Sequence, residues 1–561
     1  MSADSTWADG NTARTALVAK AAHGPDNMSS SIAAAIDNAS ADPPELDDRA
    51  LADEPRNDYG NGRRLRARHG ADMLLVDAVG WHVWDGRRFA APPDKRAPEA
   101  QKRAHQTAMA IADEAEALED DVVRPAEREL ERLEGEGSAP TPALIKEARE
   151  RLKDAIDRLD SHRKFGIGSG NSGKIAAMLL EAEPYLFRRQ RELNANPFLL
   201  NLRNATLDLG GRRRDGDVDA DPAYPRPHHR ADLITHLAPV DYDPKATCPE
   251  FDRFLATIIP DPRERAFLMR WFGYSLTGDV TEQRIVLCWG SGSNGKSTLL
   301  NAVHDAMGDY AVHLPIETFL DDPFRRAGDA TPDLVRLVGA RLALASEPRK
   351  GARLSESVVK QCTGGERMTA RRLFEGMFDF DPTFKLTLAM NEKPTIAAQD
   401  HGTWRRVTLF PFRITLEADD KSISERLRAE RAGIFNRLLD GWRDYRENGL
   451  AIPETILTAT SEYRMESDPV GQFIGSEVVE EFGAREKSAT LYGAYSRWAH
   501  ANGFNPVSST KFGRRLGELG WLKEKLGVGV MVYMGVRLRV APDGSSGDDA
   551  SSRDAGRTDR T

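Results

Sequence analysis

The sequence predicts a multidomain α/β protein whose central domain is built around a parallel sheet. Three observations support this fold class. At 561 residues the chain is long enough for about three or four domains, each with its own core. Beyond residue 279, apolar runs typical of buried strands alternate with helical patterns. Mixed helix and strand patterns on either side predict an α+β domain before this region and a smaller domain of helices and a hairpin after it.

The composition excludes several classes of protein. Hydrophobic residues make up 40% and charged residues 29% of the chain, and no run approaches the ~20 apolar residues of a membrane span. The N-terminus has no secretory pattern, and the three cysteines are too few and too scattered for a disulfide framework or a zinc site. We therefore expect a cytoplasmic protein with reduced cysteines, no structural metal and no membrane contact.

Charge is distributed unevenly along the chain. The net charge is −9, but residues 1–55 alone hold 3 Lys and Arg against 10 Asp and Glu, which predicts a disordered acidic tail. Residues 484–540 hold 10 Lys and Arg against 3 Asp and Glu, so the tail masks a basic C-terminal domain. Residues 541–561 are rich in Gly, Ser and Asp and are expected to form a second disordered tail.

Residues 56–240 are expected to form the α+β N-terminal domain. The stretch around Trp81 and Phe89 predicts short strands, and charges at helical spacing between about residues 97 and 195 predict helices. NPFLLNLRNATLDLGG then predicts strands again, and residues 243–278 predict helices that lead into the central domain.

Two stretches share the spacing G-x-x-x-x-G-K of a phosphate-binding loop. GSGSNGKS, residues 290–297, follows the apolar strand RIVLCW and precedes the helical pattern TLLNAVHDAM, so backbone N–H groups and a helix N-terminus would surround a phosphate. GSGNSGKI, residues 168–175, follows the polar stretch DSHRKF, and Ile175 has no oxygen for a magnesium ion. We expect GSGNSGKI to be a glycine link between two helices, so the chain holds one nucleotide site.

The predicted site binds ATP with Mg²⁺. Lys296 would reach the β- and γ-phosphates, and the Ser297 hydroxyl would ligate Mg²⁺. The residues expected to contact the nucleotide are Gly290, Ser291, Gly292, Ser293, Asn294, Gly295, Lys296, Ser297 and Thr298.

Hydrolysis of ATP also requires an acid, a polar sensor and an arginine. The apolar strand RLALASEP ends in Glu347, the strand FKLTLAMNEKP ends in Asn391, and HGTWRRVTLFPF places Arg405 and Arg406 ahead of a third strand. Each alone has a simple alternative: a solvated glutamate, a turn, or a surface arginine pair. Their order behind a well-formed loop favours a catalytic set, with Glu347 as the second Mg²⁺ ligand beside Ser297.

The motifs GSGSNGKST, LASEP, VVKQCTGGERMTARRLF, LAMNEKP and WRRVTLFPF resemble, in this order, those of the superfamily 3 helicases. More narrowly, residues 56–540 resemble phage and plasmid primase-helicases with a poxvirus-type N-terminal helicase-associated domain. The resemblance implies an AAA+-like P-loop NTPase domain at 241–450, linker helices at 451–483 and a winged helix at 484–540. It also implies an ATP hydrolase and DNA helicase that works as a ring of identical subunits, expected to be a hexamer.

The resemblance also implies roles for single residues. Glu347 belongs to the acidic motif, Asn391 to the sensor, and Arg405 or Arg406, with Arg406 favoured, to the finger that enters a neighbour's site. The segment around Gly364 and Gly365 matches a motif that runs into a hairpin contacting single-stranded DNA in the ring's channel. The basic side chains expected to grip DNA there are Lys360, Arg367, Arg371 and Arg372. A solvated basic hairpin is the alternative.

The basic C-terminal domain contains a second predicted DNA surface. TLYGAYSRWAHANG and SSTKFGRRLGELGW predict amphipathic helices, and VGVMVYMGVRLRV predicts a hairpin. Two or three helices with a hairpin resemble a winged helix, and the exposed face of the second helix would present Lys511, Arg514 and Arg515 to duplex DNA. A domain that binds protein rather than DNA is the alternative.

Two departures from the family pattern affect the expected function. Ser346 stands where many related ATPases have a second acid, so Mg²⁺ would rely on Ser297 and Glu347 alone. Many relatives carry a polymerase-like primase domain ahead of the helicase, and residues 1–55 leave no room for one, so any primase is expected to be a separate chain.

We therefore expect a helicase for replication of a phage, plasmid or integrated element. The main alternative is an initiator or loader that uses ATP to assemble on DNA without unwinding it. Primase activity in this same chain is a third hypothesis, for which we expect no nucleotide polymerisation on a bare template.

Overall fold

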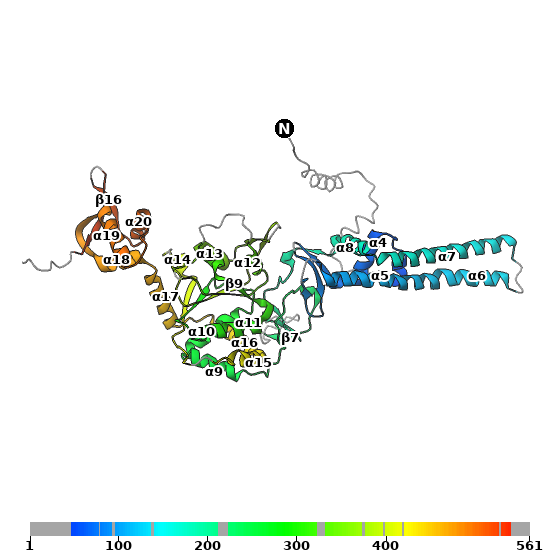
Figure 1. Ribbon diagram of the computed structural model, residues 1–561, viewed down its shortest axis with the longest axis horizontal. Helices are drawn as coiled ribbons and strands as arrows, with labels where there is room; N and C mark the ends of the chain where they lie inside the picture. The colour runs from blue at the N-terminus through cyan, green and yellow to red at the C-terminus, as the bar shows by residue number, and fades with distance from the viewer. Residues whose placement is uncertain are drawn as a thin grey trace, which may run out of the picture. The chain divides into compact units, whose positions relative to one another are not determined.

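The computed structural model describes residues 46–539, except for 78, 93–95, 136–139, 211–222, 322–330, 350, 373–375, 397–398, 418–419 and 527–528. The chain forms two compact units (Figure 1). The first consists of Met1–Ala195 with Pro227–His236, and the second of Asn196–Arg226 with Leu237–Thr561. The predicted C-terminal tail and most of the predicted N-terminal tail lie outside the described residues.

The first unit combines helices with a small sheet, as the sequence predicted. Its strands pair in the order β3-β2-β1-β4, and α6 and α7 run side by side as a long helical hairpin (Figure 1). Its core joins apolar side chains of α4, α5 and α8 to the small sheet. The main elements are α3 (Asp48–Ala52), α4 (Asp58–His69), β1 (Met73–Val76), β2 (Gly80–Trp84), β3 (Phe89–Ala90), α5 (Pro98–Leu118), α6 (Arg124–Glu134), α7 (Pro142–Ser169), α8 (Ser172–Leu186) and β4 (Phe187–Arg188).

The second copy of the loop spacing, GSGNSGKI, joins α7 to α8. A long helix rather than a strand precedes it, and α8 begins at Ser172. Lys174 pairs with Asp58 at 3.0 Å between Nζ and Oδ1, and Ile175 is buried in the core of the unit. The prediction of a glycine link between two helices is confirmed.

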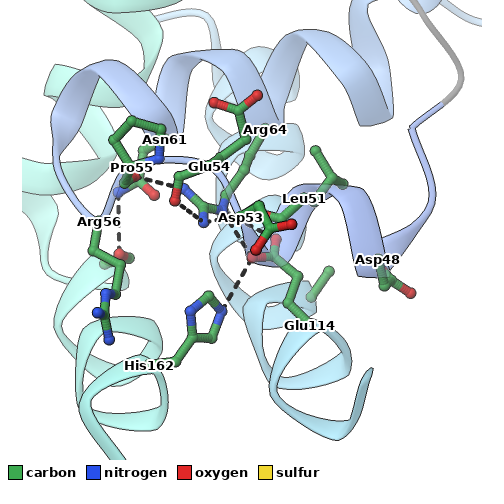
Figure 2. A network of polar contacts seen from close by, with 12 residues as sticks. Asp48, Leu51, Asp53, Glu54, Pro55, Arg56, Asn61, Arg64, Glu114 and His162 are labelled. Carbon is green, nitrogen blue, oxygen red and sulfur yellow. Dashed lines mark hydrogen bonds and ion pairs between the residues drawn. The ribbon is translucent and has the colours of Figure 1, made fainter. Parts of the chain in front are cut away.

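A buried charged network ties the helices of this unit together (Figure 2). Arg64 of α4 and Glu114 of α5 are fully buried, with Nε and Oε2 2.8 Å apart. His162 of α7 lies 3.1 Å from the same carboxylate. The remaining guanidinium nitrogens of Arg64 donate to the backbone carbonyls of Leu51, Glu54 and Pro55. The predicted end of the disordered tail at residue 55 is therefore wrong, because α3 and the turn after it are bonded into the fold.

We expect Glu114→Gln to destabilise the first unit by about 3 to 5 kcal/mol, because the Arg64 guanidinium would remain buried without its counter-charge. Burial raises the pKa of Glu114, but the hydrogen bond from His162 and the charge of Arg64 outweigh it, so the pKa lies below its ordinary value of 4.5. The ionised carboxylate thus stabilises the fold above that value, and this contribution is lost as the pH falls through the lower folded pKa.

Hydrogen exchange of the α4 amides measures this loss locally, without assuming that the whole chain unfolds in one step. The matched control is Glu129→Gln, which breaks an exposed pair with Arg132 and should leave exchange unchanged. Unaltered protection of α4 in Glu114→Gln would show that the buried pair is not needed.

The second unit is built around a parallel sheet, as predicted. In the described part of the chain its strands have the order β14-β8-β13-β10-β9, and all neighbours run parallel. Successive residues of β8 belong to different hydrophobic clusters. Val286 and Cys288 lie in one cluster, and Ile285 and Leu287 lie in the other. Both faces of the sheet are therefore buried, which explains why its strands are continuous apolar runs.

The elements of this central region follow one another as strands alternating with helices and one hairpin (Figure 1). They are β8 (Ile285–Trp289), α11 (Lys296–Met307), β9 (Ala311–Pro315), α12 (Pro332–Val335), β10 (Leu342–Ser346), α13 (Glu356–Thr363), β11 (Met368–Arg371), β12 (Met377–Phe380), β13 (Lys385–Met390), α14 (His401–Trp404) and β14 (Val407–Pro411). Helices flank them in the sequence on both sides, namely α9 (Pro249–Ile258), α10 (Pro262–Tyr274), α15 (Ile423–Ala429), α16 (Arg431–Asn448) and α17 (Glu454–Glu466).

A three-stranded sheet before α9 corrects the predicted N-terminal domain boundary at residue 240. Its strands β5 (Leu199–Asn201), β6 (Thr206–Asp208) and β7 (Tyr224–Arg226) belong to the second unit. Leu200 and Leu207 are fully buried in the same cluster as Trp271, and Trp442 Nε1 donates to the Leu209 carbonyl at 3.1 Å. The apolar pattern predicted β5 and β6 but not β7, and it carried no information on which core would bury them.

The C-terminal domain has the predicted helices and hairpin of a winged helix, with strands paired in the order β15-β17-β16. Its elements are α18 (Pro469–Glu477), β15 (Val478–Lys487), α19 (Ser488–Ala501), α20 (Ser509–Glu518), β16 (Lys523–Leu526) and β17 (Val530–Leu538). Val470 and Phe473 of α18 are buried with Tyr495 and Phe512. The domain therefore begins near α18 rather than at residue 484, whereas α17, predicted as a linker, packs against β14.

All three cysteines, Cys248, Cys288 and Cys362, are buried free thiols. Within the described ranges, no helix combines the length and the apolar character needed to cross a membrane.

Candidate functional site

The loop GSGSNGKS connects the end of β8 to the start of α11, at the edge where the parallel strands end. Gly290 has no space for a side chain, since a Cβ would lie 2.7 Å from the carbonyl oxygen of Phe412. Gly295 has φ 75°, and its Cβ would lie 2.8 Å from Ile258. The first N–H groups of α11 have no partner inside the helix. A tight glycine turn that ends at a helix N-terminus is suited to bind phosphate.

Lys296 is buried and is held by neutral oxygens. Its Nζ donates to the Gly290 carbonyl at 2.8 Å, to Asn294 Oδ1 at 2.9 Å and to Asn391 Oδ1 at 3.0 Å. Burial lowers the pKa of Lys296. Asn294 Nδ2 is also buried and has no hydrogen-bond partner in the described part of the chain. A phosphate would supply the negative charge and the acceptor oxygens that this arrangement lacks.

The strand order brings the predicted acid and sensor to the same edge. β13 lies between β8 and β10, so Asn391, directly after β13, and Glu347, directly after β10, become neighbours. Asn391 Nδ2 donates to Glu347 Oε2 at 3.2 Å. Glu347 has φ 64°, an unfavourable conformation for a residue with a side chain. Strain of this kind is concentrated at functional sites, which supports a role for Glu347.

The residues predicted to hold Mg²⁺, Ser297 and Glu347, both present oxygen donors on exposed side chains. Magnesium prefers oxygen ligands and retains several waters, so this donor set fits the ion together with phosphate oxygens. Among the described residues there is no group of three or more His, Cys, Asp or Glu placed to hold a metal. The assignment of Ser297 and Glu347 to Mg²⁺ stays a prediction.

Arg405 and Arg406 lie at the opposite edge of the same sheet. They immediately precede β14, whose first residue Val407 pairs with Ile285, while Pro411 at its end pairs with Trp289 beside the loop. Val407 and Pro411 are four residues apart, so at the usual rise of a strand they lie roughly 13 Å apart along it. Within one chain the arginines and the phosphate loop therefore occupy opposite ends of the strands.

The two arginines differ in how firmly the chain holds them. Arg405 is exposed and donates to Gln283 Oε1 at 2.7 Å. Arg406 is half-buried, and it donates to Thr363 Oγ1 at 3.0 Å and to the Gly402 carbonyl. A finger has to reach another subunit, so this geometry favours Arg405, whereas the sequence favoured Arg406.

The predicted basic hairpin is present as β11 and β12, which pair antiparallel with Arg371 opposite Met377, while its place in a channel stays a prediction. Arg371 ends β11 and Arg372 follows it, with its guanidinium 5.0 Å from the centroid of the Phe378 ring. Lys360 lies in α13 and pairs with Asp400 at 3.6 Å, and Arg367 pairs with Asp381 at 3.2 Å at the base of the hairpin. The structure thus places two of the four predicted cations, Arg371 and Arg372, toward the tip of the hairpin.

One of the predicted cations of the winged helix is not on its exposed face. Lys511 and Arg514 of α20 are exposed, but Arg515 is only 18% exposed and bonds to Asp468 at 2.7 Å and to Glu518 at 3.0 Å. Arg515 lies beside the buried Leu516, so its side chain reaches across to α18 rather than into solvent. The predicted exposure of Arg515 is wrong.

Sequence reasoning missed two residues next to the candidate site, Trp289 and Lys393. Trp289 ends β8, and its Nε1 donates to the Asn391 carbonyl at 3.0 Å. The Lys393 ammonium lies 4.1 Å from the centroid of the Trp289 ring. The available signal was their closeness in sequence to Gly290 and Asn391, but a side-chain contact between two strand ends cannot be read from spacing.

Comparison with known proteins supports the resemblance. The family described as "D5 N terminal like" matches residues 62–260, and the family described as "Poxvirus D5 protein-like" matches residues 465–529.

Three relatives from large DNA viruses match the chain. It is 30% identical over 335 residues to "Putative helicase L207/L206" of Acanthamoeba polyphaga mimivirus, a match covering 56% of this chain and 34% of the relative. It is 29% identical over 275 residues to "Putative helicase 022R" of Frog virus 3 (isolate Goorha), covering 44% and 28%. It is 26% identical over 347 residues to "Putative primase C962R" of African swine fever virus (isolate Pig/Kenya/KEN-50/1950), covering 57% and 35%. The matched part spans about a third of each relative.

A parallel sheet with a phosphate loop, preceded by an α+β region and followed by a winged helix, defines an AAA+-like P-loop protein. Residues 62–260 and 465–529 are thus similar to the two D5 families, and the viral relatives that match the chain are named as helicases or primases.

Proposed function

We propose that the protein is an ATP-dependent DNA helicase that works as a ring, a hexamer, in replication of a phage, plasmid or integrated element. The observation that carries the proposal is the contact of Lys296 with Asn391 and of Asn391 with Glu347 at the strand edge that bears the phosphate loop. The names of the viral relatives as helicases or primases support the same class of activity.

In this proposal each residue of the site has a separate role in ATP hydrolysis. Lys296 binds the β- and γ-phosphates, and Glu347 with Asn391 orients the attacking water. Ser297 and Glu347 would hold Mg²⁺, which would supply positive charge to the phosphate oxygens. The glycine turn and the start of α11 exclude water from one side of the phosphates and supply N–H donors.

The position of the arginines supports the proposed ring. Arg405 and Arg406 lie at the strand edge away from the phosphate loop of their own chain. An arginine that stabilises the transition state must contact the γ-phosphate. Either arginine can do so only at the loop of a neighbouring subunit, so the active unit is an oligomer whose sites form between copies.

DNA is the proposed partner of two surfaces. Arg371 and Arg372 near the hairpin tip would hold single-stranded DNA through its phosphates, and Lys511 and Arg514 on α20 would contact duplex DNA. Arg515 is not part of this proposal, because it is bonded to Asp468.

We expect the double variant Arg371→Ala with Arg372→Ala to lose strand separation on a forked duplex while retaining ATP hydrolysis and ATP-driven assembly. The hairpin is remote in sequence from the phosphate loop, and removing two phosphate contacts weakens the grip on DNA without touching the nucleotide. Single-turnover unwinding, measured beside ATP hydrolysis, checks this. The matched control is Lys245→Ala with Lys421→Ala, two exposed lysines. Undiminished unwinding by the hairpin variant would show that this hairpin does not hold the DNA strand, whereas no unwinding by the unaltered protein would favour the loader.

The name of the African swine fever virus relative favours a second candidate, the helicase half of a primase-helicase whose primase is a separate chain. Incubation with a bare single-stranded template and nucleotides tests it. We expect no product from this protein alone; a labelled primer would assign priming to this chain.

A further inference from the structure

We propose that Lys393 is a positioning residue that fixes the Asn391 loop against α17, so that nucleotide bound at the phosphate loop is sensed by α17. The inference rests on the proposed ATPase function and goes beyond it, because it assigns a path by which the site acts on the helix that leads into the C-terminal domain.

The Lys393 side chain has little freedom. Its Nζ lies 4.1 Å from the centroid of the Trp289 ring and 5.6 Å from that of Tyr463. It also pairs with Glu466 at 2.7 Å, and only 16% of its side chain is exposed. A cation held by two aromatic rings and a carboxylate is oriented more strongly than one in an ordinary surface ion pair.

One end of this contact is the nucleotide site. Trp289 directly precedes Gly290 of the phosphate loop, and its Nε1 holds the Asn391 carbonyl oxygen. The Asn391 side chain accepts from Lys296 and donates to Glu347. Lys393 therefore supports Asn391, which contacts both the predicted phosphate-binding lysine and the predicted acid.

The other end is α17. The buried Tyr463 donates its hydroxyl to the Pro394 carbonyl, and its ring packs edge-on against Trp404 with centroids 5.4 Å apart. Arg464 donates to the Gln399 carbonyl at 2.6 Å. The last turn of α17 thus holds the loop after Asn391 and, through Trp404, the segment that continues into Arg405.

These contacts provide a physical path from the nucleotide site to α17. When a phosphate takes up the Lys296 ammonium, Asn391 loses a hydrogen-bond donor and its side chain must reorient. Its main chain is fixed by Trp289 and, two residues later, by Lys393, so the reorientation is transmitted to Glu466 and Tyr463. From α17 the chain passes to Asp468, which accepts from Gly471 N at the start of α18 and pairs with Arg515 of α20.

The test compares Lys393→Met with Lys393→Arg and with Lys245→Met, an exposed lysine as control. We expect Lys393→Met to lower kcat for ATP about 10-fold while the KM and the Kd for a fluorescent ATP analogue change less than ~2-fold, because orientation is lost and binding is not. Lys393→Arg keeps the charge and the ring contact and should retain most activity.

Hydrogen exchange of α17 supplies a readout independent of turnover. Adding the ATP analogue should change exchange across residues 454–466 in the unaltered protein and in Lys393→Arg, and should leave it unchanged in Lys393→Met. Glu466→Gln should weaken the response, since it removes the charge that faces Lys393.

The outcomes separate this inference from the proposed function. If Lys393→Met turns over ATP normally and α17 still responds while Lys296→Ala is inactive, the inference is overturned and the function stands. If Lys296→Ala remains active, the proposed function itself fails. A loss of nucleotide affinity as large as the loss of kcat in Lys393→Met would indicate a merely structural role and would also overturn the inference.

Discussion

Lys296→Ala should reduce ATP hydrolysis by about 10²- to 10³-fold, the loss typical of removing one donor to the charge that develops in a transition state. The fold should persist, because Lys296 is a buried cation with a lowered pKa, its hydrogen bonds in the described part of the chain go to neutral oxygens, and the unbound protein gains little from it. Steady-state hydrolysis and nucleotide binding, measured on protein checked by circular dichroism, test the prediction.

The sequence itself supplies the matched control for this experiment. Lys174 holds the same place in the same glycine spacing, but it is exposed and pairs with Asp58 in the first unit. Lys174→Ala should change nucleotide affinity by less than ~0.5 kcal/mol, as surface substitutions do for stability. A comparable loss in Lys174→Ala and Lys296→Ala would refute the choice between the two loops and would mean that the chain binds two nucleotides.

Arg405→Ala should lower ATP hydrolysis by about 10³-fold or more, the range known for arginine fingers, while nucleotide binding is retained. Because Arg405 and the phosphate loop lie at opposite ends of the strands, the defect should be repaired by a neighbour. Mixing Arg405→Ala subunits with Lys296→Ala subunits should therefore restore part of the activity, since some sites would combine an intact loop with an intact arginine.

Two further variants make this prediction specific. Arg406→Ala removes bonds to Thr363 and Gly402, so we expect a lower Tm in this variant. Arg428→Ala removes an exposed pair with Asp305 and should leave hydrolysis unchanged. If no mixture of inactive variants recovers any hydrolysis, the site is not shared between subunits and the ring proposal loses its structural support.

Much of the central fold could be predicted because its signals are local. RIVLCW, RLALASEP and FKLTLAMNEKP are apolar runs of strand length, and each forms a strand of the parallel sheet. The two look-alike loops were distinguished by what precedes each, a strand before Gly290 and the long α7 before Gly170. Such signals depend on residues that are neighbours in the sequence, and the pattern of apolar and polar residues in one sequence contains this information.

The predictions failed where the partner of a residue is distant. Leu200 and Leu207 were recognised as strand residues, but the core they enter also contains Trp271. Leu51 was placed in a disordered tail, yet Arg64 and Glu114 fix that segment. Amphipathic and polar patterns indicate that a side chain is buried or paired, but they do not identify the residues that it contacts. The domain boundaries depend on such contacts between segments that are distant in the sequence.

The sequence by itself predicted a single phosphate loop, at Gly290 to Ser297, because strand, glycine turn and helix must be contiguous for it to form. Only the tertiary structure decided that Asn391 contacts both Lys296 and Glu347 while Arg405 lies at the far edge of the same sheet. The tertiary structure also decided that the Arg515 side chain pairs with Asp468 and does not lie on the exposed face of α20. Strand order and the direction of a side chain arise from packing between segments far apart in the chain, and no local pattern encodes them.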